Sequence, residues 1–316
     1  MSENMNPKVY IIILNYNGKS DTIDCLYSLA SAKLESASIV VVDNASIDGS
    51  VAEIKKEFPK VPIIENKTNL GYAGGNNVGI KFAYDKGADY ILLLNNDIKV
   101  DPYFLEELLS LALKKPKGGI FGSAIYRYDE PDKIEHLGGF YDSSVCEFVS
   151  NKKSFKVPKK VDYVCGCTIL IKRDVIKEIG FFEPKFFLLW EEADLCARAM
   201  KKGFEIWTQP TSKIWHKISA SFEDGKPQTH YFWWRNRLLW IKRNLNKKEK
   251  KLAYKKVILP EIIKAYKHFL LKGILLIFSF SGKRKKRKEQ YRRLKAGCRG
   301  IRDYFMNRFG NTYKKV

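Results

Sequence analysis

The sequence is poor in the features that mark zinc-binding, disulfide-rich or membrane-spanning proteins. Its 316 residues hold six cysteines and four histidines, and no Cys-x-x-Cys pair accompanies a histidine, so neither a zinc site nor a disulfide framework is indicated. The longest apolar stretch, residues 269–280, is interrupted by Lys272 and is too short to cross a bilayer. Residues 1–8 lack the pattern of a signal peptide. We therefore expect reduced thiols and a cytoplasmic protein.

Acidic residues are scarce in the last quarter of the chain. Residues 241–316 contain 25 Lys and Arg but only 4 Asp and Glu, which leaves 32 basic and 31 acidic residues before them. The formal charge of +22 therefore belongs almost entirely to this tail. Internal repeats and a Gly/Ser-rich linker are also missing. The sequence predicts one large domain over residues 1–240 and a basic helical extension over residues 241–316.

The first 240 residues contain a regular alternation of strand-like and helix-like segments. Residues 9–14 form a continuous β-branched apolar run, and a helical pattern follows over residues 20–32. The alternation continues in segments expected to be strands (39–42, 63–64, 90–94) and helices (48–58, 73–85, 190–202, 230–246). It predicts an α/β fold, with a Rossmann-like, mostly parallel central sheet flanked by helices. Between residues 118 and 160 the pattern weakens, and we expect loops and small strands there.

Polar residues gather where the predicted strands end, which is the edge where parallel sheets bind ligands. Asp43 ends one strand, and its carboxylate could accept a hydrogen bond from a nucleobase or a ribose; an Asx-rich turn is the alternative. Asp97 ends another strand, and carboxylate oxygens suit Mg²⁺ or Mn²⁺ bound together with a diphosphate. Capping of the next helix is the alternative for Asp97, although Asp101 before Pro102 fits that role better.

A dense acidic patch, Glu191-Glu192-Ala193-Asp194, follows an aromatic run that ends in Trp190. The helix dipole favours acidic residues in a first turn, but three carboxylates in four positions exceed what capping needs. We therefore expect one of them to act as a general base. A lone histidine such as His216 is more often structural than a ligand, and only proximity to these carboxylates would change that.

A glycine-rich stretch runs from Asn69 to Gly79. It is similar to a phosphate-binding loop, but it lacks the Lys-Ser/Thr ending of a P-loop. Its glycines could equally allow a helix to pack closely on backbone or ligand. The stretch alone therefore indicates no particular function.

In this order, the motifs resemble those of the family 2 glycosyltransferases with the GT-A fold, especially their rhamnosyltransferase-like branch. The likeness covers residues 8–246, and its most specific part is GFFEPKFFLLWEEADLCAR at residues 180–198. The resemblance implies an inverting hexosyltransferase of surface polysaccharide synthesis. Such an enzyme moves a sugar from a nucleoside-diphosphate sugar, dTDP-rhamnose being one candidate, to a hydroxyl of a glycan or a lipid-linked glycan.

The resemblance also implies a role for individual residues. Asp97 matches the last carboxylate of the family's Asp-x-Asp metal motif, whose first acidic position is Asn95 here, and His216 matches a second ligand of Mg²⁺ or Mn²⁺. Glu192 matches the catalytic base, with Glu191 beside it. The acceptor-binding positions expected are Trp190 and Asp194, although Trp190 could instead be buried against its helix. The positions expected to bind the nucleotide sugar are Asn15, Tyr16, Asn17, Asp43, Asn44, Ser46, Asn69, Gly71, Gly74, Asn76, Asn95, Asn96 and Asp97.

The basic tail predicts a negatively charged partner. An apolar stretch followed by the cations of residues 283–288 suits the anionic inner face of the cell membrane, where lipid-linked acceptors are presented. The alternative is an extension that packs on the catalytic domain or on a second copy of the chain, as in a homo-oligomer. No helix-turn-helix or RNA-binding signature accompanies the charge, so a nucleic-acid partner is not expected.

The sequence leaves two alternative functions for the whole chain. One is a non-catalytic protein that binds a nucleotide sugar, which the retained carboxylates disfavour. The other is a sugar-nucleotide pyrophosphorylase, which would need a glycine-rich loop with Arg and Lys directly after the first strand. This chain has Asn15-Tyr16-Asn17-Gly18 at that place.

Overall fold

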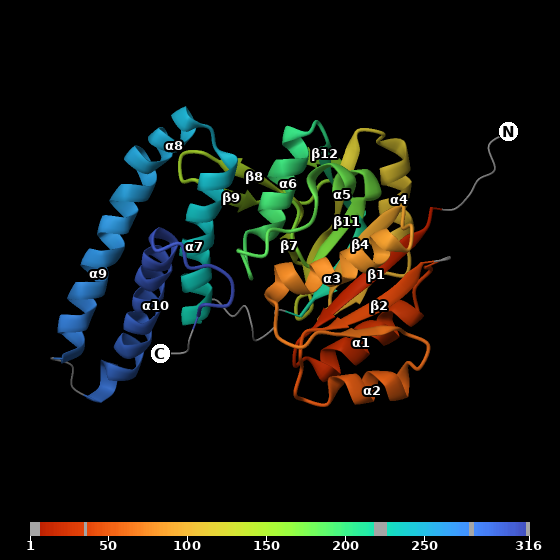
Figure 1. Cartoon of the computed structure of the whole chain (residues 1–316), viewed down its shortest axis with the longest axis horizontal. Coiled ribbons are helices and arrows are strands. Elements are labelled where there is room, and N and C mark those ends of the chain that lie inside the picture. The colour runs from red at the N-terminus through yellow and green to blue at the C-terminus, as the bar shows by residue number, and fades with distance from the viewer. Residues whose placement is uncertain (1–6, 35–36, 218–225, 278–280, 314–316) are drawn as a thin grey trace.

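The computed structural model describes residues 7–34, 37–217, 226–277 and 281–313. A twisted sheet carries helices on both faces, and a group of helices follows at one end of the molecule (Figure 1). The strands are β1 (Val9–Asn15), β2 (Ser38–Asp43), β3 (Ile63–Glu65), β4 (Tyr90–Asn95), β5 (Ile98–Val100), β6 (Gly118–Arg127), β7 (Ile134–His136), β8 (Gly139–Asp142), β9 (Glu147–Ser150), β10 (Lys159–Val161), β11 (Thr168–Lys172) and β12 (Glu205–His216). The helices are α1 (Lys19–Ala30), α2 (Ser50–Glu57), α3 (Gly71–Asp85), α4 (Phe104–Lys114), α5 (Arg173–Ile179), α6 (Glu191–Lys201), α7 (Pro227–Asn244), α8 (Lys247–Ala253), α9 (Leu259–Ile277) and α10 (Ser281–Phe305), with a π-helical turn over Tyr254–Ile258.

The sheet follows the predicted α/β pattern. Its strand order is β10-β12-β6-β11-β4-β1-β2-β3. Strands β1, β2, β3 and β4 run parallel, and so do β6 and β12, whereas β11 is antiparallel to both of its neighbours. The register pairs Asn15 with Asp43 and Leu14 with Asn95. The predicted polar ends of β1, β2 and β4 therefore meet at one edge.

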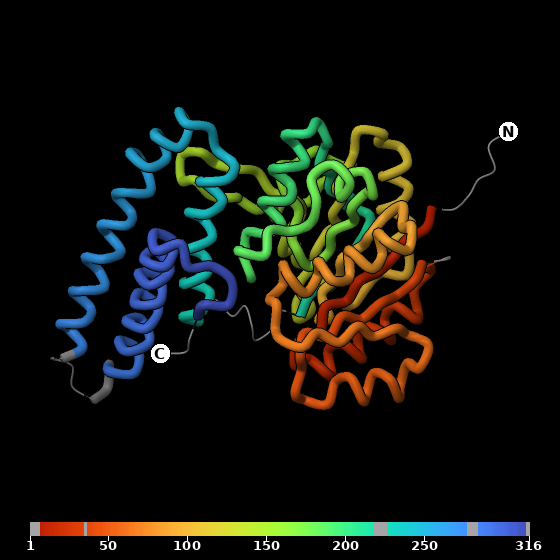
Figure 2. Tube along the Cα trace, in the orientation of Figure 1, coloured from red at the N-terminus to blue at the C-terminus, as the bar shows by residue number. Residues whose placement is uncertain are grey.

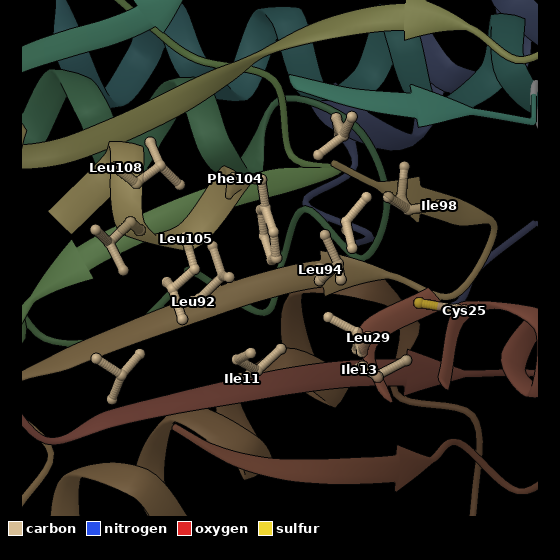
Figure 3. Packing of buried hydrophobic residues seen from close by; sticks show 14 of the residues in the cluster. Ile11, Ile13, Cys25, Leu29, Leu92, Leu94, Ile98, Phe104, Leu105 and Leu108 are labelled. Carbon is tan, nitrogen blue, oxygen red and sulfur yellow. The ribbon is translucent and has the colours of Figure 1, made fainter. Parts of the chain in front are cut away.

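Both faces of the sheet are buried, which explains the unbroken apolar run of β1. Val9, Ile11 and Ile13 point into a core shared with α1, α2 and α4 (Figure 3). Tyr10 and Ile12 point to the other face, which α3, α5 and α6 cover. Because successive strand residues alternate between faces, a strand with helices on both sides must be apolar at every position.

The prediction of loops and small strands for residues 118–160 missed β6. This strand is ten residues long and lies between β11 and β12 inside the sheet. Its glycines hide it in the sequence, because glycine is unfavourable in strands unless packing requires it. At Gly122, an added Cβ would lie 2.7 Å from the side chain of Val164. Close packing, and not a turn, therefore explains this glycine.

The helical extension is built onto the sheet domain through α7. The boundary predicted at residue 240 falls inside this helix, which is continuous to Asn244. Helix α10 packs along α7, where Gly300 lies against the backbone of Tyr231, and α9 packs on α10. The three helices lie side by side in the chain trace (Figure 2). Among the described residues, no helix has the length and apolarity needed to cross a membrane.

Candidate active site

The loops after β1 and β2 are tied together by hydrogen bonds between predicted site residues. The Asn15 amide donates to Asp43 Oδ1 at 2.8 Å, and the other oxygen of Asp43 accepts from the Ser46 backbone at 2.9 Å. Ser46 Oγ in turn accepts from the backbone of Asn17. Asn15 and Asp43 are buried, whereas Tyr16 is 51% exposed. Tyr16 is thus free to contact a ligand, and the buried pair fixes the loop that carries it.

A third loop joins this network through Asn44. Its amide donates to Asn69 Oδ1 at 3.0 Å and to the Gly71 carbonyl at 3.1 Å, and its Oδ1 accepts from the backbone of Leu70. Asn96 makes a corresponding link from the end of β4 to helix α1, because its amide donates to Thr22 Oγ1 at 3.0 Å. The strand ends are therefore preorganised before any ligand binds.

The glycine-rich stretch has a structural role. The amides of Tyr72 and Ala73, at the start of α3, both donate to the carbonyl of Phe187, so they are not free for a phosphate. Gly71 has a φ of 73°, and an added Cβ would lie 2.3 Å from the same carbonyl. Asn76 is buried, and its amide donates to the Tyr72 carbonyl at 3.0 Å. The start of α3 is therefore packed on the loop before α6, and Asn76 bonds within α3 itself. Gly74 packs on Leu70 in the same turn.

Asp97 and His216 face each other at the end of the sheet. Strand β12 pairs with β5, and this pairing places His216 Nε2 3.4 Å from Asp97 Oδ1. Both atoms are buried, and they form an ion pair with each other when His216 is protonated. His216 Nδ1 lies 3.3 Å from Glu135 Oε2 on β7. Burial lowers the pKa of His216, but the hydrogen bonds to Asp97 and Glu135 outweigh it and raise the pKa to about 10.

This arrangement fits a divalent cation. Two ligands that are each about 2.1 Å from one ion can lie up to about 4.2 Å apart, so the separation of Asp97 Oδ1 and His216 Nε2 is compatible with a shared ion. Glu135 bonds the other ring nitrogen of His216, and a carboxylate in that position orients a metal-binding histidine. The described residues form no cluster of three or more such ligands. The remaining ligands would therefore be diphosphate oxygens and water, as Mg²⁺ commonly prefers.

Glu191 and Glu192 begin α6 with carboxylates that are mostly removed from water. Burial raises the pKa of Glu192 to about 7, against the opposing effect of the amides in the first turn of α6. Burial and the neighbouring Glu192 raise the pKa of Glu191 well above its ordinary value. One oxygen of each carboxyl has no partner among the described residues. A carboxyl that titrates near neutral pH is suited to general base catalysis, and Glu192 has this property.

A pair of cysteines connects the Asp97 side of the site with the Glu192 side. The Cys167 thiol donates a hydrogen bond that lowers the pKa of Cys165. The carboxylate of Glu192 and the ring of His216 both act on that pKa as well, with opposite signs, and Asp97 acts on the pKa of Cys167. Cys165 is therefore close to groups on both sides. The charges of Glu192, His216 and Asp97 therefore reach this cysteine pair from three different segments of the chain.

A cavity of about 890 Å³ borders Asp97 on the side of α1. Its walls include Asp21, Asp24 and Tyr27 of α1 together with Trp215 and Lys217. The Lys217 ammonium bonds both aspartates, at 3.2 and 2.6 Å. Asp43, Glu192 and His216 do not line this cavity. The cavity therefore extends from Asp97 along α1, and the other predicted site residues named here do not line it.

The loop that presents Glu191 and Glu192 is strained and held from outside. Phe187, Leu189 and Trp190 all have positive φ values, of 63°, 72° and 75°, which costs about 1–3 kcal/mol for each such residue. The Asn236 amide of α7 donates to the carbonyls of Phe186, Leu188 and Leu189 at 2.8, 2.7 and 2.8 Å. Asn236 is fully buried, and it is absent from the site residues predicted from the sequence.

Arg235, the neighbour of Asn236, is also fully buried and was also not predicted. Its guanidinium donates to the carbonyls of Lys185 and Phe186 and, on its other side, to the Gly310 carbonyl and to Thr312 Oγ1. The C-terminal segment is thereby joined to the loop before α6. A signal was present in the sequence, since Arg235-Asn236-Arg237 interrupts an otherwise aromatic and apolar helix.

Two residues expected to bind the acceptor make structural contacts within the protein. Asp194 is fully buried and bonds Arg198 Nε at 2.8 Å, Arg243 Nε at 2.9 Å and the Asn244 amide at 2.8 Å. These contacts attach α6 to α7, and a buried carboxylate with three donors has no need of a sugar hydroxyl. Trp190 is 8% exposed and packs among aromatic side chains that include Trp240. Trp190 is therefore buried, which is the alternative that the sequence left open.

The profile of Glycosyl transferase family 2 matches residues 10–180, more than half of the chain. The chain belongs to this family. A hexosyltransferase of low-salt glycan biosynthesis, Agl10 from Haloferax volcanii, is 28% identical over 211 residues, covering 65% of this chain and 66% of that protein. The N-acetylglucosaminyl-diphospho-decaprenol L-rhamnosyltransferase of Mycobacterium tuberculosis is 24% identical over 256 residues, covering 69% and 83%.

Solved structures confirm the GT-A fold. A crystal structure of GalNAc-T7 with UDP, GalNAc and Mn²⁺ superposes with a TM-score of 0.63 at 15% identity. The match covers 96% of this chain but only 57% of that protein. This chain also spans just under two thirds of Agl10. The prediction of a family 2 glycosyltransferase with a mostly parallel sheet and a helical C-terminal extension is confirmed.

Proposed function

We propose that this glycosyltransferase moves a sugar, with inversion, from a nucleoside-diphosphate sugar to a hydroxyl of a glycan or lipid-linked glycan. The observation that carries the proposal is the buried pair of Asp97 and His216, whose facing atoms lie 3.4 Å apart, together with a glutamate whose pKa is about 7. Rhamnose is the donor sugar to test first, because one relative is a rhamnosyltransferase. That relative's name also makes a diphospho-lipid-linked sugar the first acceptor to test.

In the proposed reaction, Glu192 takes the proton from the acceptor hydroxyl while the oxygen attacks the anomeric carbon. The bond from that carbon to the diphosphate breaks, and the nucleoside diphosphate leaves with the bonding electrons. A divalent cation held by Asp97 and His216 would neutralise the charge that develops on the diphosphate. Tyr16 would contact the base, and the Asn15–Asp43 pair would hold the loop in place. Positioning of the two substrates supplies much of the remaining rate enhancement.

The proposal includes the location of the enzyme. We place it at the cytoplasmic face of the cell membrane, held there by the basic extension over residues 241–316, because a lipid-linked acceptor is presented at that surface. Residues 1–240 would supply the transferase, with α7 shared between the two parts.

The test begins with thermal unfolding of the purified protein in Mn²⁺ against a panel of sugar nucleotides, because a bound ligand stabilises the folded state. Transfer to a diphospho-lipid-linked acceptor is then followed, and the anomeric configuration of the product is read by NMR. Retention of configuration would contradict the direct displacement. Stabilisation without any transfer would support a non-catalytic binding protein, and release of pyrophosphate would support a pyrophosphorylase.

A further inference from the structure

The helical extension contains a cationic cavity of about 260 Å³ between the end of α9, one side of α10 and the start of α7. Lys288, Arg292, Lys295 and Arg299 line it, together with Tyr313 and other residues. Their spacing of four, three and four residues puts the four cations on one side of α10. In the described part of the chain, none of the lining residues is acidic.

The charge in this cavity is poorly compensated. Lys288, Arg292 and Lys295 are exposed, and none has an ion-pair partner within the described residues. Arg299 is half-buried and lies 3.9 Å from Asp303. Burial raises the pKa of Tyr313, and the charges of Arg292 and Arg299 oppose this shift. Arg292, Arg299 and Tyr313 all line the wall of this cavity, where the two guanidinium groups could hold an anion together.

An exposed apolar stripe runs along α9. Leu259, Ile263, Tyr266, Leu270 and Ile274 recur every three or four residues, and Leu270 is 62% exposed. Large apolar side chains gathered on one exposed helix face mark an interaction surface. Tyr266 is the least exposed of the five, and its hydroxyl donates to the Cys298 carbonyl of α10.

The stripe and the cationic cavity lie on the same side of the helix pair. The contact line passes through the stacked rings of Phe269 on α9 and Tyr291 on α10. The pairs Lys272–Gln290 and Tyr266–Cys298 show that the helices are antiparallel. Each residue of an α-helix is rotated by about 100° around the helix axis relative to the one before it. Counted in this way from the contact line, the stripe is centred roughly 100° around α9. The basic residues are centred roughly 70° around α10, in the same sense of rotation. For antiparallel neighbours, the same sense of rotation leads to the same side.

We propose that this cavity binds the phosphate of an anionic membrane lipid while the α9 stripe enters the adjoining acyl layer. Guanidinium and ammonium groups form charge-assisted hydrogen bonds with phosphate oxygens. Apolar residues beside cations are the features that hold a helix in the plane of a membrane surface. The inference rests on the membrane attachment in the proposed function, and it names the site that provides the attachment.

The test measures binding of the full chain to phosphatidylcholine vesicles with and without phosphatidylglycerol. One variant removes three cavity charges (Lys288→Gln, Arg292→Gln, Lys295→Gln). A matched control removes three charges from the same helix outside the cavity (Arg284→Gln, Lys285→Gln, Lys286→Gln). We expect the cavity variant to weaken binding at least tenfold more than the control does. Equal losses would show that diffuse charge alone holds the protein, and would overturn the proposed site.

Two further measurements distinguish a lipid site from a site for free phosphate. Leu270→Ser with Ile274→Ser should weaken vesicle binding, and excess glycerol phosphate should not displace the native protein. Complete displacement by glycerol phosphate would show a site for free phosphate and would overturn the lipid assignment. If the native protein ignores phosphatidylglycerol altogether, the membrane attachment itself fails. Transfer to a water-soluble acceptor reports on the catalytic proposal separately, because the cavity residues lie outside the catalytic site.

Discussion

Asn236 is expected to control the position of Glu192 without touching a substrate. Its side-chain amide is the shared donor for the carbonyls of Phe186, Leu188 and Leu189, in the loop that leads into α6. The Phe186 carbonyl keeps Arg235 as a donor, so Asn236→Ala removes the side-chain donor of two carbonyls, those of Leu188 and Leu189. Each such loss costs about 1–3 kcal/mol when the acceptor is buried. Because two of the carbonyls are only partly buried, we expect the free energy of unfolding to fall by about 2–4 kcal/mol.

The larger effect of Asn236→Ala should be on catalysis. Without the amide, the left-handed residues before Glu191 can relax, and a displacement of about 1 Å at a catalytic group can cost about 100-fold in rate. We expect kcat to fall by about that factor, with little change in the KM for the donor, because the loops after β1 and β2 are untouched. Steady-state kinetics and denaturant unfolding measure the two effects separately.

Asn244→Ala provides a matched control for Asn236→Ala. Asn244 is a second buried asparagine of α7, and its amide donates to Asp194 instead of the loop. It should lose stability while keeping most of its kcat and the native pH profile. A native kcat in Asn236→Ala, or equal losses of kcat in both variants, would refute the positioning role.

Three further outcomes are expected. The value of kcat/KM should rise as pH increases through about 7, because Glu192 can accept the acceptor's proton only after losing its own; Glu192→Gln should lower the rate by about 10²–10⁴ and flatten the pH profile. Chelators should abolish turnover, and Asp97→Ala and His216→Ala should remove stimulation by Mn²⁺, so a rate independent of added metal would contradict the cation site. Asp194→Ala should lower the free energy of unfolding, measured in denaturant, by about 3 kcal/mol and leave the KM for the acceptor unchanged. A raised KM would show that Asp194 contributes to acceptor binding.

Local sequence predicted the sheet and the residues at its edge. The apolar runs of β1, β2 and β4 are visible because both of their faces are buried, and parallel order then brings Asp43 and Asp97 to one edge. Strand β6 was not predictable in this way, since its glycines are set by neighbours such as Val164 that are distant in sequence.

The partners of the predicted site residues depend on contacts between distant segments. Glu135 meets His216 only because β6 pairs with both β7 and β12. Asn236 meets its loop only because α7 packs there, some 50 residues later in the sequence. For the same reason, the contacts of the glycine-rich stretch and of Asp194 could not be predicted from the sequence. The sequence showed that these residues were unusual for their positions, whereas tertiary packing determines which groups they bond.

Arg235 affects the order in which the protein can fold during translation. Its guanidinium spans from Lys185 and Phe186 to Gly310 and Thr312. A nascent chain therefore cannot complete the surroundings of this loop until residues 310–312 have been translated and have left the ribosome. Deleting those residues would remove two acceptors of a buried cation, so a shortened form of the protein should retain them.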